Sequence, residues 1–164
     1  MIGPWRFVRS LLRQGWPGFA AAAALQFATV ASGGLEQGDR HLGLVELTFD
    51  HGFALAGREN SLHLSAQHVY GGGFSEFQVG DLQTVSNIDA DDGTRLLEAW
   101  VEVPLAGSRS VLVGRYDLNS EFDLIEAGGL FLAGSQGMGN DVLQTGAAGP
   151  SIFVRNALGI RLLE

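Results

Sequence analysis

Two runs of alternating apolar and polar residues, joined by a short break, constrain this chain more than any other feature. The first run spans residues 97–103 and the second spans residues 110–117, with residues 104–108 between them. Because the side chains of a strand point alternately to its two faces, each run gives a strand with one apolar and one polar face. Two such strands around a turn predict a β-hairpin.

Other stretches of the chain repeat this pattern. Residues 41–50 and 61–70 alternate over roughly the ~9–11 residues with which a tilted strand crosses a bilayer. Residues 157–163 have the composition of a further strand, and the 24 glycines recur at the breaks between alternating runs. The sequence therefore predicts an all-β, antiparallel fold.

Between these strands the pattern is irregular. We expect residues 74–93 to form a long loop with a short strand near residues 77–82. Residues 118–127 have weak helical character, and the glycine-rich residues 128–149 read as a loop with at most a short strand near residues 130–133.

The amino terminus has the three-part pattern of a secretory signal peptide. Arg6, Arg9 and Arg13 stand without acidic neighbours, and an alanine-rich apolar run follows at residues 19–31. Small residues end that run, so we predict a signal peptide of residues 1–31 and cleavage before Ser32. The alternative is a buried or membrane-anchoring helix, for which the run is short of the ~20 residues that span a bilayer.

Charge and composition exclude several kinds of partner. The ten basic residues are all arginine, the acidic residues number eighteen, and the net charge of −8 argues against binding to nucleic acid. The chain has no cysteine, so it forms no disulfide bond. No later stretch has the length of a transmembrane helix, so a membrane protein of this sequence would have to be a closed β-barrel.

Signals for catalysis are weak. Without lysine the chain cannot form the usual phosphate-binding loop. His63 and His68 are five residues apart on one strand, hence on opposite faces, and we expect His63 to face water. Glu98 and Glu102 are separated by ~13 Å along a strand, more than the carboxylates of a glycosidase. We predict no enzymatic activity, no cofactor and no metal site.

The polar face of the central hairpin supplies the candidate binding residues. Glu98 and Glu102 flank Trp100 on one strand, an arrangement that suits a sugar, because the indole packs on C–H groups while carboxylates accept hydroxyl protons. Trp100 as a core or interface aromatic, with solvated acids, is the alternative. On the second strand, Arg115 and Asp117 share a face and complete the candidate set.

Several segments resemble the carbohydrate-selective porin (OprB) family. They are residues 80–88 (GDLQTVSNI), 97–102 (LEAWVE) and 114–122 (GRYDLNSEF), and the likeness covers about residues 33–163. The resemblance implies a bacterial outer-membrane β-barrel through which sugars diffuse passively, with charged and aromatic residues at its narrow point. Family members are much longer, and position 154 is valine where the family often has proline.

These observations predict an exported outer-membrane protein whose residues 32–164 form the amino-terminal part of a transmembrane β-barrel. Sugars would be its permeants, outer-membrane lipid would surround it, and Glu98, Trp100, Glu102, Arg115 and Asp117 would line the lumen. A strand-like run at the last residues and too few strands for closure predict a truncated, partial barrel. The alternatives are a small complete eight-stranded barrel that acts as anchor or adhesin, and a secreted soluble β-domain that binds or hydrolyses carbohydrate.

Overall fold

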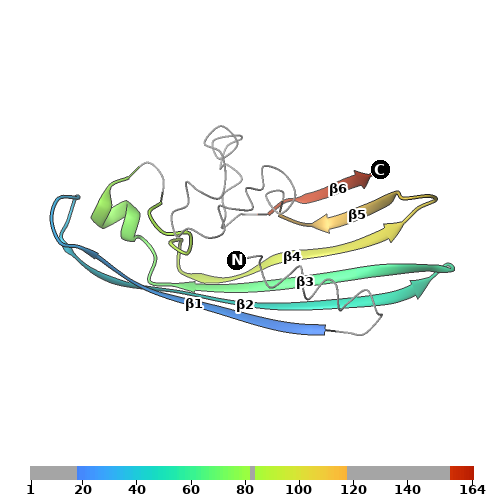
Figure 1. Cartoon of the computed structure of the whole chain (residues 1–164), viewed down its shortest axis with the longest axis horizontal. Helices are drawn as coiled ribbons and strands as arrows, with labels where there is room; N and C mark the ends of the chain where they lie inside the picture. Colours follow the sequence, from blue (N-terminus) through green and yellow to red (C-terminus); the bar gives the residue numbers. More distant parts are fainter. Residues whose placement is uncertain (1–17, 82–83, 118–155) are drawn as a thin grey trace.

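The computed structural model describes residues 18–81, 84–117 and 156–164. Six antiparallel strands form one sheet in which each strand pairs with the next along the chain (Figure 1). The strands are β1 (Gly18–Val30), β2 (Gly38–Leu55), β3 (Arg58–Tyr70), β4 (Gly93–Pro104), β5 (Ser110–Arg115) and β6 (Leu158–Leu163). A single π-helical turn, η1 (Ser75–Val79), lies between β3 and β4. The predicted all-β, antiparallel fold is confirmed.

The predicted strands and the central hairpin are present. Residues 41–50 and 61–70 lie inside β2 and β3, and the hairpin runs through β4 and β5. Its turn is closed by a hydrogen bond from the Leu105 backbone N–H to the Arg109 carbonyl, 2.8 Å long. The β2–β3 turn has positive φ at Ala56 (54°) and Gly57 (73°), which is the two-residue hairpin form that matches strand twist.

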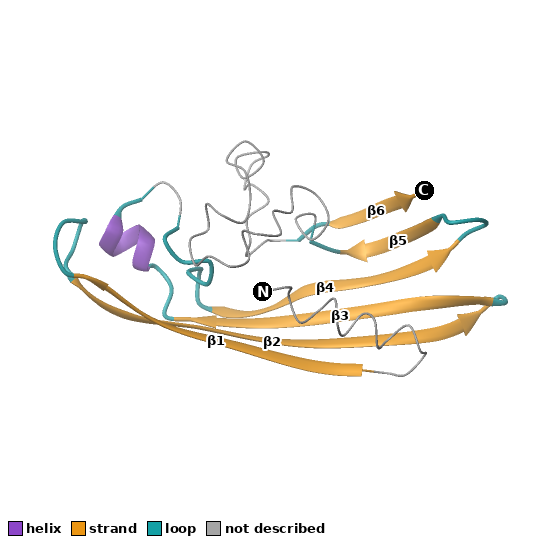
Figure 2. Cartoon of the chain, in the orientation of Figure 1, coloured by secondary structure: helices purple, strands orange, loops and turns teal. Residues whose placement is uncertain are grey.

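The two ends of the sheet differ in their connections. Figure 2 shows the short β2–β3 and β4–β5 turns together at one end, and the β1–β2 connection with η1 at the other. At that second end Gly71 and Gly73 adopt φ values of 79° and 87°, and a side chain at Gly71 would overlap the carbonyl of His41. These glycines let the chain turn sharply out of β3.

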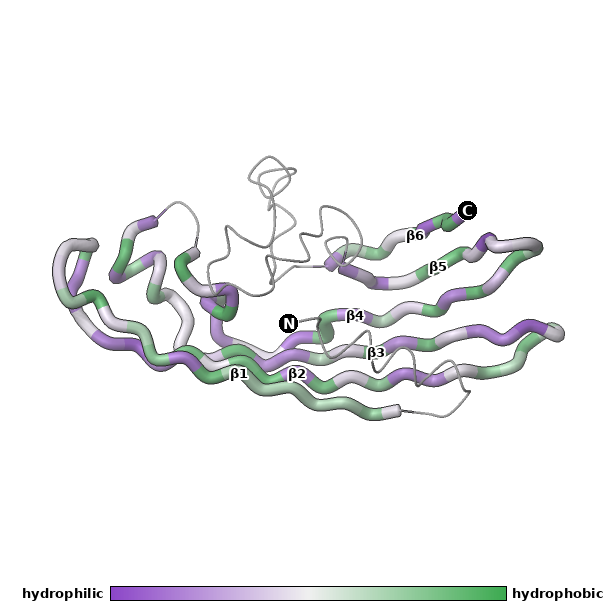
Figure 3. The backbone as a smooth tube through the Cα atoms, viewed as in Figure 1, coloured by the Kyte–Doolittle hydropathy of each residue, from purple (hydrophilic) through white to green (hydrophobic). Residues whose placement is uncertain are grey.

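The two faces of the sheet differ in polarity. We call the face that carries Asp50, His63 and Glu98 the inner face, and the opposite face, which carries Phe19, Leu47 and Leu64, the outer face. The register of the five strand pairs keeps each set on its own side, because paired residues share a face. The alternation of green and purple along the strands in Figure 3 reflects this division.

The outer face is apolar and exposed on all six strands. Phe19, Leu25, Leu158 and Ile160 are 75–86% exposed, and Leu47 in the middle of β2 is 57% exposed. Other exposed apolar residues of this face are Phe27, Val45, Leu64, Leu96, Val113 and Leu162. No described segment covers these side chains, so the sheet presents an extensive apolar surface, interrupted by the polar side chains of His51, His68 and Arg115.

The segment between β3 and β4 packs on the inner face. Leu42, Phe74 and Ile88 form its core, against which Ala24, Ala28, Val30, Leu44 and Val79 pack. The buried Asp89 carboxylate accepts hydrogen bonds from the backbone N–H groups of Gly73, Phe74 and Ser75, between 2.7 and 3.3 Å long. The prediction of a short strand near residues 77–82 is wrong, because the backbone at Ser75–Val79 forms the π-helical turn η1.

A β-bulge shifts the register between β3 and β4. Ser65 pairs with Glu98 while Ala66 pairs with Leu96, so Leu97 has no partner on β3. Leu97 is 9% exposed, whereas Leu96 is 48% exposed. The alternation expected from Leu97 onward therefore holds only from Glu98, and Leu96 is the exposed leucine of this strand.

The apolar run assigned to the signal peptide lies largely in β1. Every residue of Gly18–Val30 has a partner on β2, from Gly18 with Asp50 to Val30 with Gly38. A cut after Ala31 would remove this strand from the sheet. Residues 1–17, with the three arginines of the signal-peptide pattern, lie outside the described residues, as do the expected helix at 118–127, the loop at 128–149 and Val154.

Candidate functional site

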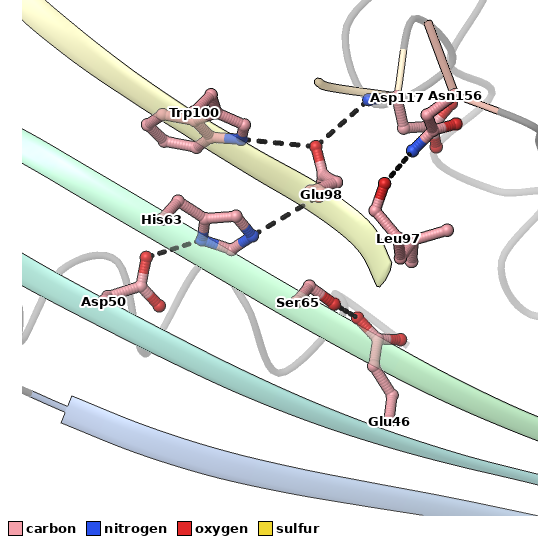
Figure 4. Close-up of polar contacts among 9 residues, drawn as sticks. All are labelled: Glu46, Asp50, His63, Ser65, Leu97, Glu98, Trp100, Asp117 and Asn156. Carbon is pink, nitrogen blue, oxygen red and sulfur yellow. Dashed lines mark hydrogen bonds and ion pairs between the residues drawn. The ribbon is translucent and has the colours of Figure 1, made fainter. Parts of the chain in front are cut away.

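A row of interacting side chains crosses three strands on the inner face. Asp50 on β2, His63 on β3 and Trp100 on β4 are register partners, so their side chains stand side by side. His63 Nδ1 lies 2.7 Å from Asp50 Oδ1, and His63 Nε2 lies 3.4 Å from Glu98 Oε2 (Figure 4). Both carboxylates face ring nitrogens, an arrangement that suits an imidazolium, which donates from both.

Glu98 joins this row to the chain that follows β5. One carboxylate oxygen, Oε1, accepts hydrogen bonds from the Trp100 indole N–H at 3.3 Å and from the Asp117 backbone N–H at 3.1 Å. The other oxygen faces His63. Because its side chain is only 13% exposed, Glu98 has little surface for a ligand. Its contacts stabilise the sheet instead.

Trp100 does not offer its ring to a ligand. It stacks on the His63 ring with centroids 4.7 Å apart and an angle of 16° between the planes, and it is 8% exposed. Such offset stacking stabilises the pair beyond the burial of its area. The burial of Trp100 agrees with the alternative of a core aromatic, but the solvated acids of that alternative do not hold for Glu98, whose side chain is 13% exposed.

A second cluster forms around Glu102, the other predicted carboxylate. Its Oε1 lies 2.7 Å from Arg161 Nη2 and accepts a hydrogen bond of 2.5 Å from the Ser110 hydroxyl. Arg161 comes from β6, on the far side of β5, where it registers with Leu112. The Glu102 side chain is 28% exposed, so it remains accessible on the inner face.

The structure separates Arg115 from the other predicted residues. Arg115 registers with Ala99, on the face opposite Glu98, Trp100 and Glu102, so grouping it with them was wrong. The pairing of Pro104 with Ser110 fixes this register, and it places Val113 and Arg115 together. Asp117 lies just beyond β5 and meets Glu98 through its backbone N–H.

Several residues of the inner face were missed or misread from the sequence. His63 was expected to face water, but it is 6% exposed because two carboxylates and an indole surround it. Asp50 and Arg161 were not singled out, although Asp50 stands on the polar side of the alternating run at residues 41–50. Asn156 was also missed; its side-chain N–H donates to the Leu97 carbonyl at the bulge (Figure 4).

Polar groups continue along the inner face towards η1. The Ser65 hydroxyl donates to the Glu46 carboxylate at 2.8 Å, and Thr48, Ser65 and Gln67 are buried there. Together with Asp50 and Glu102, these groups give the inner face a string of oxygen acceptors. Of these groups, Glu46 and Glu102 keep exposed surface and can accept hydrogen bonds from hydroxyl or amino groups, whereas Thr48, Ser65 and Gln67 are at most 4% exposed.

Two negative findings apply to residues 18–81, 84–117 and 156–164. Within them, no three histidine, cysteine, aspartate or glutamate side chains gather as they would to hold a metal ion. No helix in this part of the chain is long and apolar enough to cross a membrane.

Comparisons with protein families, with curated proteins and with solved structures find no match to this chain.

Proposed function

We propose that the chain forms part of an outer-membrane β-barrel through which sugars diffuse passively, as in carbohydrate-selective porins. One observation carries this proposal: the outer face carries exposed apolar side chains on all six strands, while the carboxylates of Glu46, Asp50, Glu98 and Glu102 lie on the inner face. Transmembrane barrels alternate in this sense, with apolar residues toward lipid and polar residues toward the lumen.

The extent of the outer face favours lipid over water as its surroundings. Soluble monomers rarely expose contiguous apolar patches larger than a few hundred Å², since such patches promote association. Strands β1 to β4 have 12–18 residues, and tilted strands of ~9–11 residues suffice to cross a bilayer. Strands β1 to β4 are therefore long enough to span a membrane, whereas β5 and β6 have six described residues each.

Aromatic residues near both ends of the outer face favour the same reading. His51 stacks on Phe53 with ring centroids 6.3 Å apart, near the end with the short turns. Phe27 packs on His41 at 5.0 Å, near the opposite end. Bands of aromatic residues at both membrane interfaces are typical of outer-membrane barrels.

Sugar passage is supported by the acceptors of the inner face. Glu46 and Glu102 keep part of their surface exposed and can accept hydrogen bonds from hydroxyl groups. Trp100 does not take part, because His63 covers its ring. The mechanism is diffusion along a polar wall, without bond chemistry and without a cofactor.

Closure is a necessary part of the proposal. β1 and β6 are the first and last strands of the described sheet, so each has one neighbour in it. An unpaired strand edge is not stable within lipid, because its backbone groups lack partners. In the proposed barrel, further strands pair with both edges.

Reconstitution into phospholipid vesicles tests the function. We expect vesicles that contain the chain together with the strands that close its barrel to swell in isosmotic monosaccharide and to stay unchanged in a large branched polysaccharide. A chain that is monomeric in water without detergent would contradict the membrane location and favour a secreted β-domain. A chain that needs detergent yet leaves vesicles impermeable to sugars would favour an anchor or adhesin.

A further inference from the structure

The thirteen residues Gly18–Val30 are integrated into the sheet along their whole length. Each has a partner on β2, in a register without a bulge. On the outer face, Phe19 and Phe27 pack on Phe49 and His41. These contacts reach both ends of the strand, so β1 is not a loosely attached terminus.

The inner side of β1 also makes specific side-chain contacts. The Gln26 side-chain oxygen accepts a hydrogen bond of 2.6 Å from the hydroxyl of Ser86, which is 0% exposed. Ala24 and Ala28 pack against the core of Leu42, Phe74 and Ile88. Small side chains suit these two positions because the β3–β4 segment packs on β1 there, whereas Ala21 and Ala23 are exposed on the outer face.

The connection that follows β1 is held in the same way. The backbone N–H groups of Leu35 and Glu36 both donate to the carbonyl of Gln78 in η1, at 2.7 and 3.2 Å. A side chain at Gly34 would press on the Val30 side chain and the same Gln78 carbonyl. The bond between Ala31 and Ser32 therefore lies between two anchored segments.

We propose that Gly18–Val30 is a permanent strand of the folded protein and that the Ala31–Ser32 bond stays intact, in place of the cut that the signal-peptide pattern predicts. Cleavage would remove thirteen residues that pair with β2, make β2 the edge strand in place of β1, and leave the buried Ser86 hydroxyl without its acceptor. Each loss is costly, since buried polar groups and strand edges need partners. The proposal does not depend on the proposed function.

The first test is the amino terminus of the unaltered chain. The full chain with a carboxyl-terminal tag is expressed in a Gram-negative host and purified in its folded form, and its intact mass and terminal sequence are measured. We expect a chain that still contains residues 18–31. A folded chain that begins at Ser32 overturns the proposal.

The second test locates β1 in the folded chain and uses the absence of native cysteine. Ala23 and Val45 are register partners, so Ala23→Cys with Val45→Cys should form a disulfide on mild oxidation. The control combines Ala23→Cys with Phe49→Cys; because Phe49 pairs with Phe19, its thiol lies ~13 Å along the strand and should not react. No cross-link in the first pair, or equal cross-linking in both, overturns the proposal.

Discussion

Leu47 is the position at which a charged substitution should change the free energy of unfolding most differently in lipid and in water. It lies in the middle of β2, it is 57% exposed, and its neighbours in register are Ala21 and Ala66. His41 and Phe53 lie six residues to either side, ~20 Å along the strand at ~3.3 Å per residue. With a tilt of ~40°, this places Leu47 ~15 Å from each interface, at the centre of a bilayer core of ~30 Å.

The perturbation is Leu47→Arg. At the bilayer midplane an outward-facing arginine destabilises a barrel by about 2–4 kcal/mol, or roughly 30-fold to 700-fold in the unfolding equilibrium. In water, the same substitution at a half-exposed site surrounded by alanines changes the free energy of unfolding by less than about 0.5 kcal/mol. The changes in the free energy of unfolding expected in lipid and in water thus differ by several times the error of the measurement.

Urea unfolding in phospholipid vesicles measures the difference, followed by the fluorescence of Trp100 after Trp5→Phe and Trp16→Phe remove the other two tryptophans. Leu105→Arg is the matched control, since Leu105 lies in the β4–β5 turn and is 37% exposed. We expect the control to stay within about 0.5 kcal/mol of the unaltered chain. If Leu47→Arg stays within that range as well, the outer face does not meet lipid.

Three further substitutions test the interior. His63→Leu leaves two carboxylates of low exposure without their partner and should destabilise the chain by about 3–5 kcal/mol in urea titrations, whereas His68→Leu on the outer face should be nearly neutral. Gly114→Ala should lower the free energy of unfolding by about 1–3 kcal/mol more than Gly107→Ala does. Both glycines have positive φ, but only at Gly114 would the added methyl group press on the β4 backbone, so equal losses of stability would contradict this packing. Asp89→Ala should raise amide hydrogen exchange at residues 73–75 at least about tenfold while the sheet stays protected, and unchanged exchange would show that these bonds do not hold the segment.

Alternation in the sequence was sufficient to predict the strands but not their neighbours. Residues 41–50, 61–70 and 97–103 gave β2, β3 and β4 because each run has a clear period of two. The second hairpin strand mixes Val113 and Arg115 on one side with Leu112 on the other, so its polar face is ambiguous. The register of the β4–β5 hairpin, set by the turn at residues 105–109, decides which face is polar. Local periodicity contains no information about this register.

The interior network depends on contacts between distant segments. His63 meets Asp50 across a short turn, but Glu102 meets Arg161 across 59 residues. Neither periodicity nor composition predicts which strands become neighbours over such a separation. The alanine run at residues 19–31 shows a related difficulty, since small apolar residues suit a signal peptide and a tightly packed strand equally well.

Lipid contact along β2 is the most direct test of the central claim that the outer face lies in a membrane. Because the chain has no cysteine, single cysteines can carry a fluorophore at Leu47 on the outer face and at the partly exposed Glu46 on the inner face. With the chain folded in vesicles that contain lipids with quencher groups on their acyl chains, the account predicts strong quenching at position 47 and little at position 46. Equal quenching at the two positions, or none at position 47, would contradict it.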